Sequence, residues 1–195
     1  MIVGVLLAAG TGSRFGGEHK LLADLDGEPV VARAARSLAA SSLDDRVAVV
    51  GHERDRVERA LPESFAVVGN PDYERGQSTS VRRGVAAARE RGADAALFAL
   101  GDMPTVSVET VDALLAAYRE RESGNAGIVA PRYDGRRGNP VLFDARYFDA
   151  LADVEDDAGG RAVLESESVR WVDVDDPGVH RDVDTVADLR ALREE

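Results

Sequence analysis

The residues best suited to chemistry lie in a glycine-rich loop near the start of the chain. This loop follows the apolar run Ile2–Ala8 and extends to Lys20. Glycine lets the backbone approach a ligand closely, and successive N–H groups can then point toward an anion. Arg14 can place a guanidinium fork on phosphate oxygens, whereas Lys20 offers a compact point charge. The loop therefore predicts a site for a phosphorylated ligand, and a flexible loop without function is the alternative.

Lys20 stands out by composition. Of the 24 basic residues, Lys20 is the one lysine and all others are arginine. An exposed surface position would be served by arginine in this sequence, so a retained lysine indicates a specific task. Two common phosphate-binding motifs do not match, because Gly10, Gly12 and Gly16 are spaced too widely for a dinucleotide fingerprint and Leu21 follows the lysine where a P-loop requires Ser or Thr.

Two carboxylates are candidate metal ligands. Asp102 follows the apolar run Ala95–Leu100, and a carboxylate at the carboxyl end of a parallel strand can bind Mg²⁺, which prefers oxygen ligands. Mg²⁺ would neutralise the charge that develops when a phosphate ester is displaced. The alternative is that Asp102 is an ordinary turn aspartate before a proline. Asp184, just before the last predicted helix, is a second candidate ligand, and a helix N-cap is an equal interpretation of it.

Apolar runs alternate with helical patterns along the whole chain, which indicates how these residues are positioned. Strands are predicted at residues 2–8, 46–50, 65–68, 95–100, 127–130, 140–143 and 169–174. Helices are predicted at residues 29–40, 53–61, 79–91, 108–121, 161–167 and 186–193. The alternation favours a single-domain α/β fold over residues 1–195, with a doubly wound, mostly parallel sheet and helices on both faces. Ligands of such sheets bind at the carboxyl ends of the strands, so the loops bearing Lys20 and Asp102 should share one crevice.

Composition limits the classes of partner. The chain carries 36 acidic and 24 basic residues, a net charge of -12, which argues against nucleic-acid binding. No apolar run approaches the ~20 residues of a membrane helix. No targeting signal is recognisable, so we expect a cytoplasmic protein without a membrane partner. The absence of cysteine excludes disulfides and thiolate sites. The acidic, arginine-rich balance favours a halophilic protein, with genome base composition as the alternative, and the oligomeric state stays open.

The glycine-rich loop resembles the signature of the nucleotidyltransferases that build molybdopterin dinucleotides and activated sugars. The matching residues are Leu7, Ala8, Ala9 and Gly10, followed by Arg14, Gly16 and Lys20. This resemblance implies a Rossmann-like nucleotidyltransferase fold, in which Arg14 and Lys20 hold the triphosphate and act in catalysis. The segment 101–104 resembles the metal-binding motif of the same family, which makes Asp102 both a catalytic residue and a metal ligand. The segment 182–185 resembles an element near the C-terminus of related enzymes in which a carboxylate can approach the metal, which implies the same role for Asp184. The implied nucleotide-binding residues of the loop are Leu7, Ala8, Ala9, Gly10, Gly12, Arg14 and Lys20.

Later segments resemble one branch of this family, the molybdenum cofactor cytidylyltransferases. Residues 70–81 match that branch better than the guanylyltransferase branch, which also tends to glycine at the position of Ala9. The resemblance implies nucleotide contacts from Asn70, Gly76, Ser78 and Ser80, for which helix capping is the alternative. Residues 138–141 and 157–162 resemble the acceptor segments of the branch. The implied acceptor-binding residues are Gly138, Asn139, Pro140 and Arg161.

The resemblance implies an Mg²⁺-dependent enzyme that transfers a nucleoside monophosphate from an NTP, with CTP favoured, to a phosphorylated small molecule. Molybdopterin is the expected acceptor and pyrophosphate the second product. Aligning two anions and offsetting their repulsion is sufficient for this reaction, and His19 could also contact the phosphates. One alternative is a guanylyltransferase or sugar-phosphate nucleotidyltransferase. Another is a non-catalytic nucleotide-binding regulatory module, against which the presence of both Lys20 and Asp102 argues.

Overall fold

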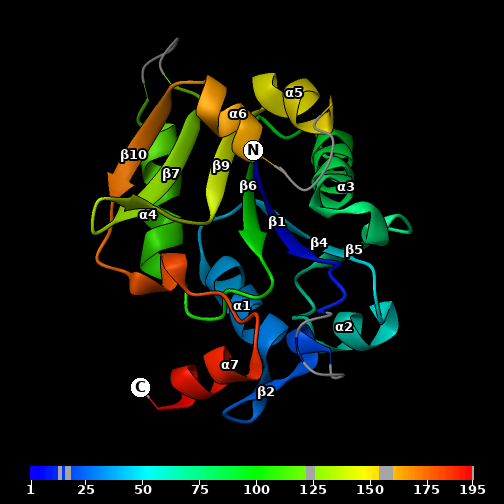
Figure 1. The fold of residues 1–195 in the computed structure, drawn as a ribbon. Coiled ribbons are helices and arrows are strands. Elements are labelled where there is room, and N and C mark those ends of the chain that lie inside the picture. The colour runs from blue at the N-terminus through cyan, green and yellow to red at the C-terminus, as the bar shows by residue number, and fades with distance from the viewer. Residues whose placement is uncertain (13–14, 16–18, 122–125, 154–159, 195) are drawn as a thin grey trace.

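A mixed sheet of eight strands forms the centre of the protein (Figure 1). The computed structural model describes residues 1–12, 15, 19–121, 126–153 and 160–194. The strand order is β10-β7-β9-β6-β1-β4-β5, and β8 pairs with β7. The strands are β1 (Ile2–Ala8), β4 (Asp45–Val50), β5 (Ala66–Gly69), β6 (Ala95–Leu100), β7 (Ile128–Tyr133), β8 (Arg136–Arg137), β9 (Val141–Asp144) and β10 (Val169–Asp173).

Strand β1 lies in the interior of the sheet and pairs in parallel with both β4 and β6. All seven of its residues are buried, as expected of a parallel strand covered on both faces. Strand β9 departs from this pattern because it runs antiparallel to both β6 and β7, and the short β8 is likewise antiparallel to β7. A parallel return needs a crossover of a dozen or more residues, and the link from β7 to β9 is shorter than that. The mostly parallel sheet predicted from sequence is thereby confirmed.

Helices cover both faces of the sheet, as predicted (Figure 1). Successive strand residues point to opposite faces, so Leu6 packs with one set of helices and Val5 with the other. The first set is α1 (Val30–Ala40), α2 (Arg54–Ala60) and α4 (Val108–Arg119). The second set is α3 (Gln77–Glu90), α5 (Phe148–Asp153) and α6 (Arg161–Ser166). Within the described ranges, none of the helices is long and apolar enough to cross a membrane.

A short hairpin that the sequence analysis did not predict connects the glycine-rich loop to α1. It pairs β2 (Asp24–Leu25) with β3 (Glu28–Pro29). Its turn residues Asp26 and Gly27 have φ of 54° and 86°, and an Asp-Gly pair is a strong hairpin signal. Leu25 joins Leu189 of α7 (Val186–Arg193) in a small apolar cluster. The hairpin thus anchors the C-terminal segment beside the start of α1.

Candidate functional site

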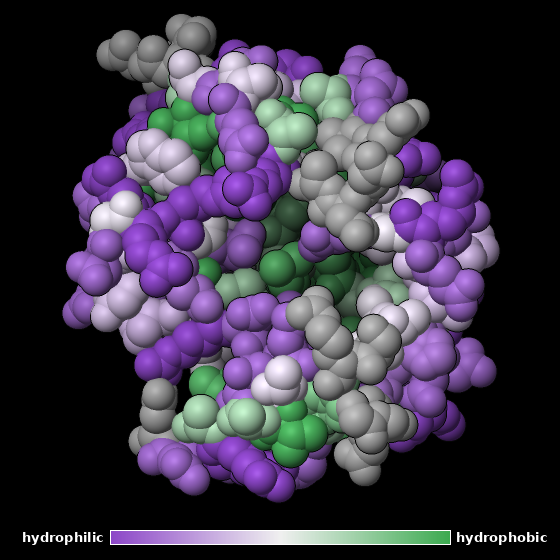
Figure 2. Space-filling view, in the orientation of Figure 1, coloured by the Kyte–Doolittle hydropathy of each residue, from purple (hydrophilic) through white to green (hydrophobic). Residues whose placement is uncertain are grey.

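A cavity of about 630 Å³ opens at the carboxyl ends of β1 and β6. In the space-filling view the molecule is hollowed near its centre, with hydrophobic residues at the floor and hydrophilic residues around much of the rim (Figure 2). The loops after the two strands therefore do share one crevice, as the fold class predicted. The predicted nucleotide-binding residues that line the cavity are Leu7, Ala9, Gly10, Gly12, Lys20, Gly76 and Ser80.

The glycine-rich loop packs directly against Lys20. Gly12 has a φ of 60°, a left-handed conformation that glycine adopts without strain. A Cβ at this position would lie 3.0 Å from Cγ of Lys20, so a larger residue would press on the lysine stem. The N–H of Phe15 donates to the Gly12 carbonyl at 2.9 Å. Gly12 therefore lets the loop and the ammonium line the same wall. Arg14, its predicted partner on the triphosphate, lies outside the described residues.

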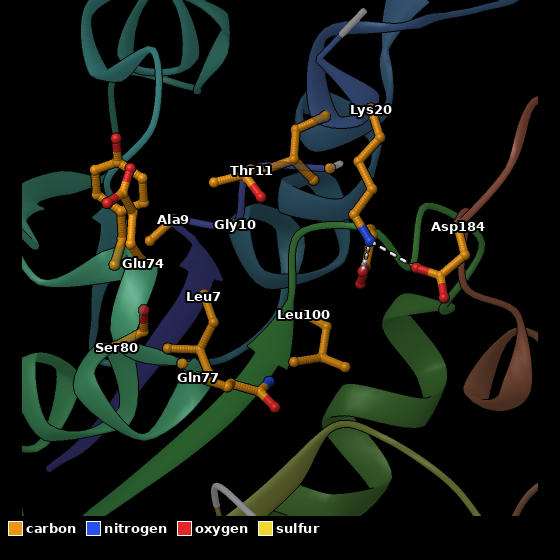
Figure 3. A pocket seen from close by; sticks show the side chains of 15 residues that line it. Leu7, Ala9, Gly10, Thr11, Lys20, Glu74, Gln77, Ser80, Leu100 and Asp184 are labelled. Carbon is orange, nitrogen blue, oxygen red and sulfur yellow. Dashed lines mark hydrogen bonds and ion pairs between the residues drawn. The ribbon is translucent and has the colours of Figure 1, made fainter. Parts of the chain in front are cut away.

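The ammonium of Lys20 joins the two candidate metal ligands. Its Nζ lies 2.6 Å from Oδ2 of Asp102 and 2.8 Å from Oδ1 of Asp184, and Figure 3 shows Lys20 and Asp184 directed toward each other. The Lys20 side chain is 13% exposed, so these contacts are only partly screened by solvent. Burial lowers the pKa of Lys20, but the charges and hydrogen bonds of Asp102 and Asp184 outweigh that effect and raise it. Lys20 therefore stays positively charged.

Asp184 reaches this cluster because its segment is tied to the loop after β6. The N–H of Val183 donates to the Asp102 carbonyl at 2.8 Å. The N-cap of α7 is Thr185, which exchanges hydrogen bonds with Asp188 in a capping box. Asp184 therefore directs its carboxylate to the cavity while its neighbour caps the helix. Burial raises the pKa of the adjacent Asp182, and the negative charges of Asp102 and Asp184 add to the shift.

Asp102 and Asp184 are suited to hold a divalent cation. Their oxygens converge on one positive centre, the Lys20 ammonium, at 2.6 and 2.8 Å. Mg²⁺ is typically held by one or two carboxylates together with substrate phosphates and water. In the part of the chain that the structure describes, no group of three or more His, Cys, Asp or Glu side chains forms a more complete site. This donor set matches a cation that is shared with a bound nucleotide.

The segment between β5 and α3 forms the opposite wall. Asn70 is 2% exposed, and its amide donates to the hydroxyls of Thr79 and Ser80 at 2.9 and 3.0 Å. Its side-chain oxygen accepts from the N–H of Asp72 at 3.0 Å. Asn70 therefore braces the loop from inside, and Ser78 is likewise buried. Sequence reasoning missed the lining residues Tyr73, Glu74 and Gln77, although they belong to the segment it singled out.

His19, expected to be a possible phosphate contact, packs inside the protein. It is 7% exposed, and its ring stacks on that of His52 with centroids 5.2 Å apart and planes 9° from parallel. The ring of Tyr73, which lines the cavity, lies 5.9 Å beyond His52. Burial lowers the pKa of His19, and the charge of His52 lowers it further. The stack connects the glycine-rich loop to the opposite wall.

A second pocket of about 220 Å³ adjoins the first and shares Leu7, Gln77 and Leu100 with it. The predicted acceptor residues Asn139 and Arg161 line this pocket. Gly138 instead packs against Val179, and Pro140 lines a smaller cavity between α1 and the end of β6. Residues 157–159 of the predicted acceptor segment lie outside the described residues. Apolar side chains that contribute to the second pocket are Val81, Phe98, Val141, Phe143, Leu151 and Leu164.

The chain is similar to known proteins over nearly its whole length. Residues 4–172 match the family described as the MobA-like NTP transferase domain. The chain belongs to this family. It is 35% identical to nicotine blue oxidoreductase of Paenarthrobacter nicotinovorans and 28% identical to purine catabolism protein PucB of Bacillus subtilis (strain 168). Each match covers 98% of this chain and 96% of the relative.

Solved structures agree with this assignment. The crystal structure of Rv0371c from Mycobacterium tuberculosis H37Rv superposes with a TM-score of 0.86 at 27% identity, covering 100% of this chain and 98% of that one. A second structure of Rv0371c, in complex with manganese, gives a TM-score of 0.80 at 27% identity over 100% and 98% of the two chains. The family binds nucleoside triphosphates and phosphorylated acceptors. The nucleotidyltransferase activity and the fold predicted from sequence are confirmed.

Proposed function

We propose that this nucleotidyltransferase uses CTP and Mg²⁺ and transfers the cytidylyl group to the phosphate of molybdopterin. The observation that carries the proposal is the meeting of two pockets at Leu7 and Leu100. The larger pocket contains the ammonium and both carboxylates, and the smaller one is lined mainly by apolar side chains. A nucleotide in the first and an acceptor in the second would be adjacent, as in-line transfer requires.

The chemistry needs no strong general base. An oxygen of the acceptor phosphate attacks the α-phosphorus of CTP, the bond from this phosphorus to the bridging oxygen breaks, and pyrophosphate leaves with the bonding electron pair. The acceptor oxygen is already ionised, so the protein must align two anions and offset their repulsion. Lys20 supplies positive charge, and the loop up to Gly12 supplies backbone N–H groups. A divalent cation held by Asp102 and Asp184 would neutralise further phosphate charge.

The wall near Ala9 favours a pyrimidine. Ala9 lines the cavity and is 3% exposed, and its methyl group takes up space that a glycine would leave open. Gly51 lies directly behind it, since a Cβ there would be 2.8 Å from the Ala9 carbonyl oxygen. The backbone at Ala9 is therefore backed by Gly51 and has little room to move away from a larger base.

The smaller pocket favours an acceptor with a flat ring system over a sugar that carries many hydroxyl groups. Its walls include Phe98 and Phe143, whose rings meet edge to face at 6.0 Å. Sugar hydroxyls buried against such walls would lose hydrogen bonds to water without replacement. Arg137 and Arg161 offer cations for the acceptor phosphate. The Arg161–Glu165 ion pair is exposed, so exchanging it for a phosphate costs little.

Binding and turnover test this proposal together. Calorimetric titration of each of the four NTPs with Mg²⁺, in high KCl, should show the tightest binding for CTP. Pyrophosphate release should require molybdopterin and not occur with a hexose 1-phosphate. Ala9→Gly should reduce the preference for CTP over GTP by about tenfold, the size expected for one methyl group. Tighter binding of GTP by the unaltered enzyme, or turnover with the sugar phosphate alone, would refute the proposal.

A further inference from the structure

The ammonium of Lys20 lies where a divalent cation would have to bind. It contacts Asp102 at 2.6 Å and Asp184 at 2.8 Å, and these are the carboxylates suited to hold the metal. An ammonium and a divalent cation repel each other strongly at such separations in a partly buried site. The two therefore cannot share these carboxylate oxygens. Lys20 must give up its present partners before a metal can take them.

A second set of partners for Lys20 lies on the same wall. Its stem packs against Gly12, and the ammonium lines the cavity together with the loop residues Gly10 and Thr11. Figure 3 shows the Lys20 side chain entering the cavity from the side of this loop. A flexible four-carbon stem can redirect its ammonium by rotamer changes alone. Phosphates bound along the loop would therefore be within its range.

The negative charges of Asp102 and Asp184 need a neighbouring cation both with and without bound nucleotide. Val183 ties the segment of Asp184 to Asp102 through a backbone hydrogen bond of 2.8 Å, which keeps the two carboxylates together. Asp182 adds a third acidic group on the same segment. Without a cation between them these groups would repel one another, so the departure of Lys20 is favourable only when a metal replaces it.

We propose that Lys20 exchanges partners when the metal and the nucleotide bind. In the nucleotide-free enzyme the ammonium neutralises Asp102 and Asp184; when the nucleotide arrives with its cation, the carboxylates bind the cation and the ammonium moves to the phosphates. This inference rests on the proposed metal site. Because Lys20 competes with free metal, metal alone binds weakly and binds better with nucleotide. By reciprocity, the metal increases the affinity for nucleotide.

Manganese binding without nucleotide tests the exchange directly. Free Mn²⁺ would be titrated by electron paramagnetic resonance and by calorimetry into the unaltered enzyme, Lys20→Met and Lys20→Gln, each checked for folding by circular dichroism. Both variants remove the competing charge, so each should bind Mn²⁺ at least tenfold more tightly than the unaltered enzyme. The two substitutions differ in polarity, so agreement between them excludes an effect of the new side chain. Equal or weaker Mn²⁺ binding by the folded variants would overturn the proposal.

The double variant Lys20→Met with Asp102→Asn separates the two ways of failing. If the gain in Mn²⁺ affinity disappears in the double variant, the cation binds at Asp102 and the exchange holds. If Asp102→Asn weakens Mn²⁺ binding but Lys20→Met does not strengthen it, the metal site is correct and only the exchange is wrong. If Asp102→Asn changes Mn²⁺ binding in neither background, the proposed metal site itself fails.

Discussion

At the scale of single residues, the proposed chemistry depends on three charged groups that come from distant parts of the chain. Lys20 follows β1, Asp102 follows β6, and Asp184 precedes α7. Each was recognisable in the sequence for a different reason: one lysine among arginines, one carboxylate at a strand end, and one resemblance. Only the structure reveals that Asp102 and Asp184 both contact the ammonium of Lys20.

Replacement of Asp102 by Asn should abolish turnover without unfolding the protein. The substitution keeps the size of the side chain, and Lys20 retains Asp184 as a partner. Loss of a metal ligand should reduce pyrophosphate release by about 100-fold or more, since the metal contributes several kcal/mol to the transition state. Asp175→Asn, at an exposed position, is the matched control and should behave like the unaltered enzyme. Near-normal release from Asp102→Asn at saturating Mg²⁺ would contradict the assigned role.

His19 should make the folded protein sensitive to mild acid. Because burial lowers its pKa in the folded state, the unfolded chain binds a proton more readily as the pH falls below about 6.5. Stability is therefore full above that pH and declines as the pH falls toward the lowered pKa of His19. Thermal melts between about pH 7.5 and 5.5 should record this decline, and His19→Phe should reduce it. An unchanged pH dependence in His19→Phe would show that other groups cause the decline.

At the scale of elements, the sequence predicted those strands and loops that a local pattern of residues defines. Continuous apolar runs marked β1 and β6, and the glycines after β1 marked the binding loop. The β2–β3 hairpin was missed because each strand has only two residues, too short for any periodicity. Local patterns also could not show that the last segment both caps α7 and directs a carboxylate to the cavity. Thr185 caps α7 and leaves Asp184 directed at the cavity, an outcome decided by the tertiary contact of Val183 with Asp102.

The loop between β5 and α3 gives a prediction at this scale. Asn70→Ala removes two donated hydrogen bonds and one accepted bond, and it leaves buried hydroxyls on α3 without this partner. We expect a loss of about 1–3 kcal/mol in the free energy of unfolding. Nucleotide affinity should also fall, because Ser80 and Gln77 line the cavity just beyond the loop. Urea unfolding and calorimetry would measure both, with Glu63→Ala at an exposed position as control. Unchanged stability would show that the bonds of Asn70 are dispensable.

At the scale of the whole molecule, the enzyme must bind two anions although its own net charge is -12. The positive charge near the cavity is therefore local, with Lys20 at the larger pocket and Arg137 and Arg161 at the smaller one. Repulsion among the surface carboxylates opposes compaction, and it weakens as salt shortens the Debye length from about 10 Å at 0.1 M to about 3 Å at 1 M. The partly buried contacts of Lys20 are screened far less.

Salt should therefore stabilise this protein. Raising KCl from about 0.1 M to 2 M should increase the melting temperature by several degrees, because surface repulsion is screened while the buried apolar core is retained. Salt can also strengthen apolar burial in general, so a charge variant is needed as a control. Combining Glu63→Gln, Glu90→Gln and Asp175→Asn removes three negative charges from exposed positions. This variant should melt higher than the unaltered protein at low salt and gain less from added KCl. Equal salt responses in both proteins would show that acidic repulsion does not set the salt dependence, and the halophilic interpretation of the composition would fail.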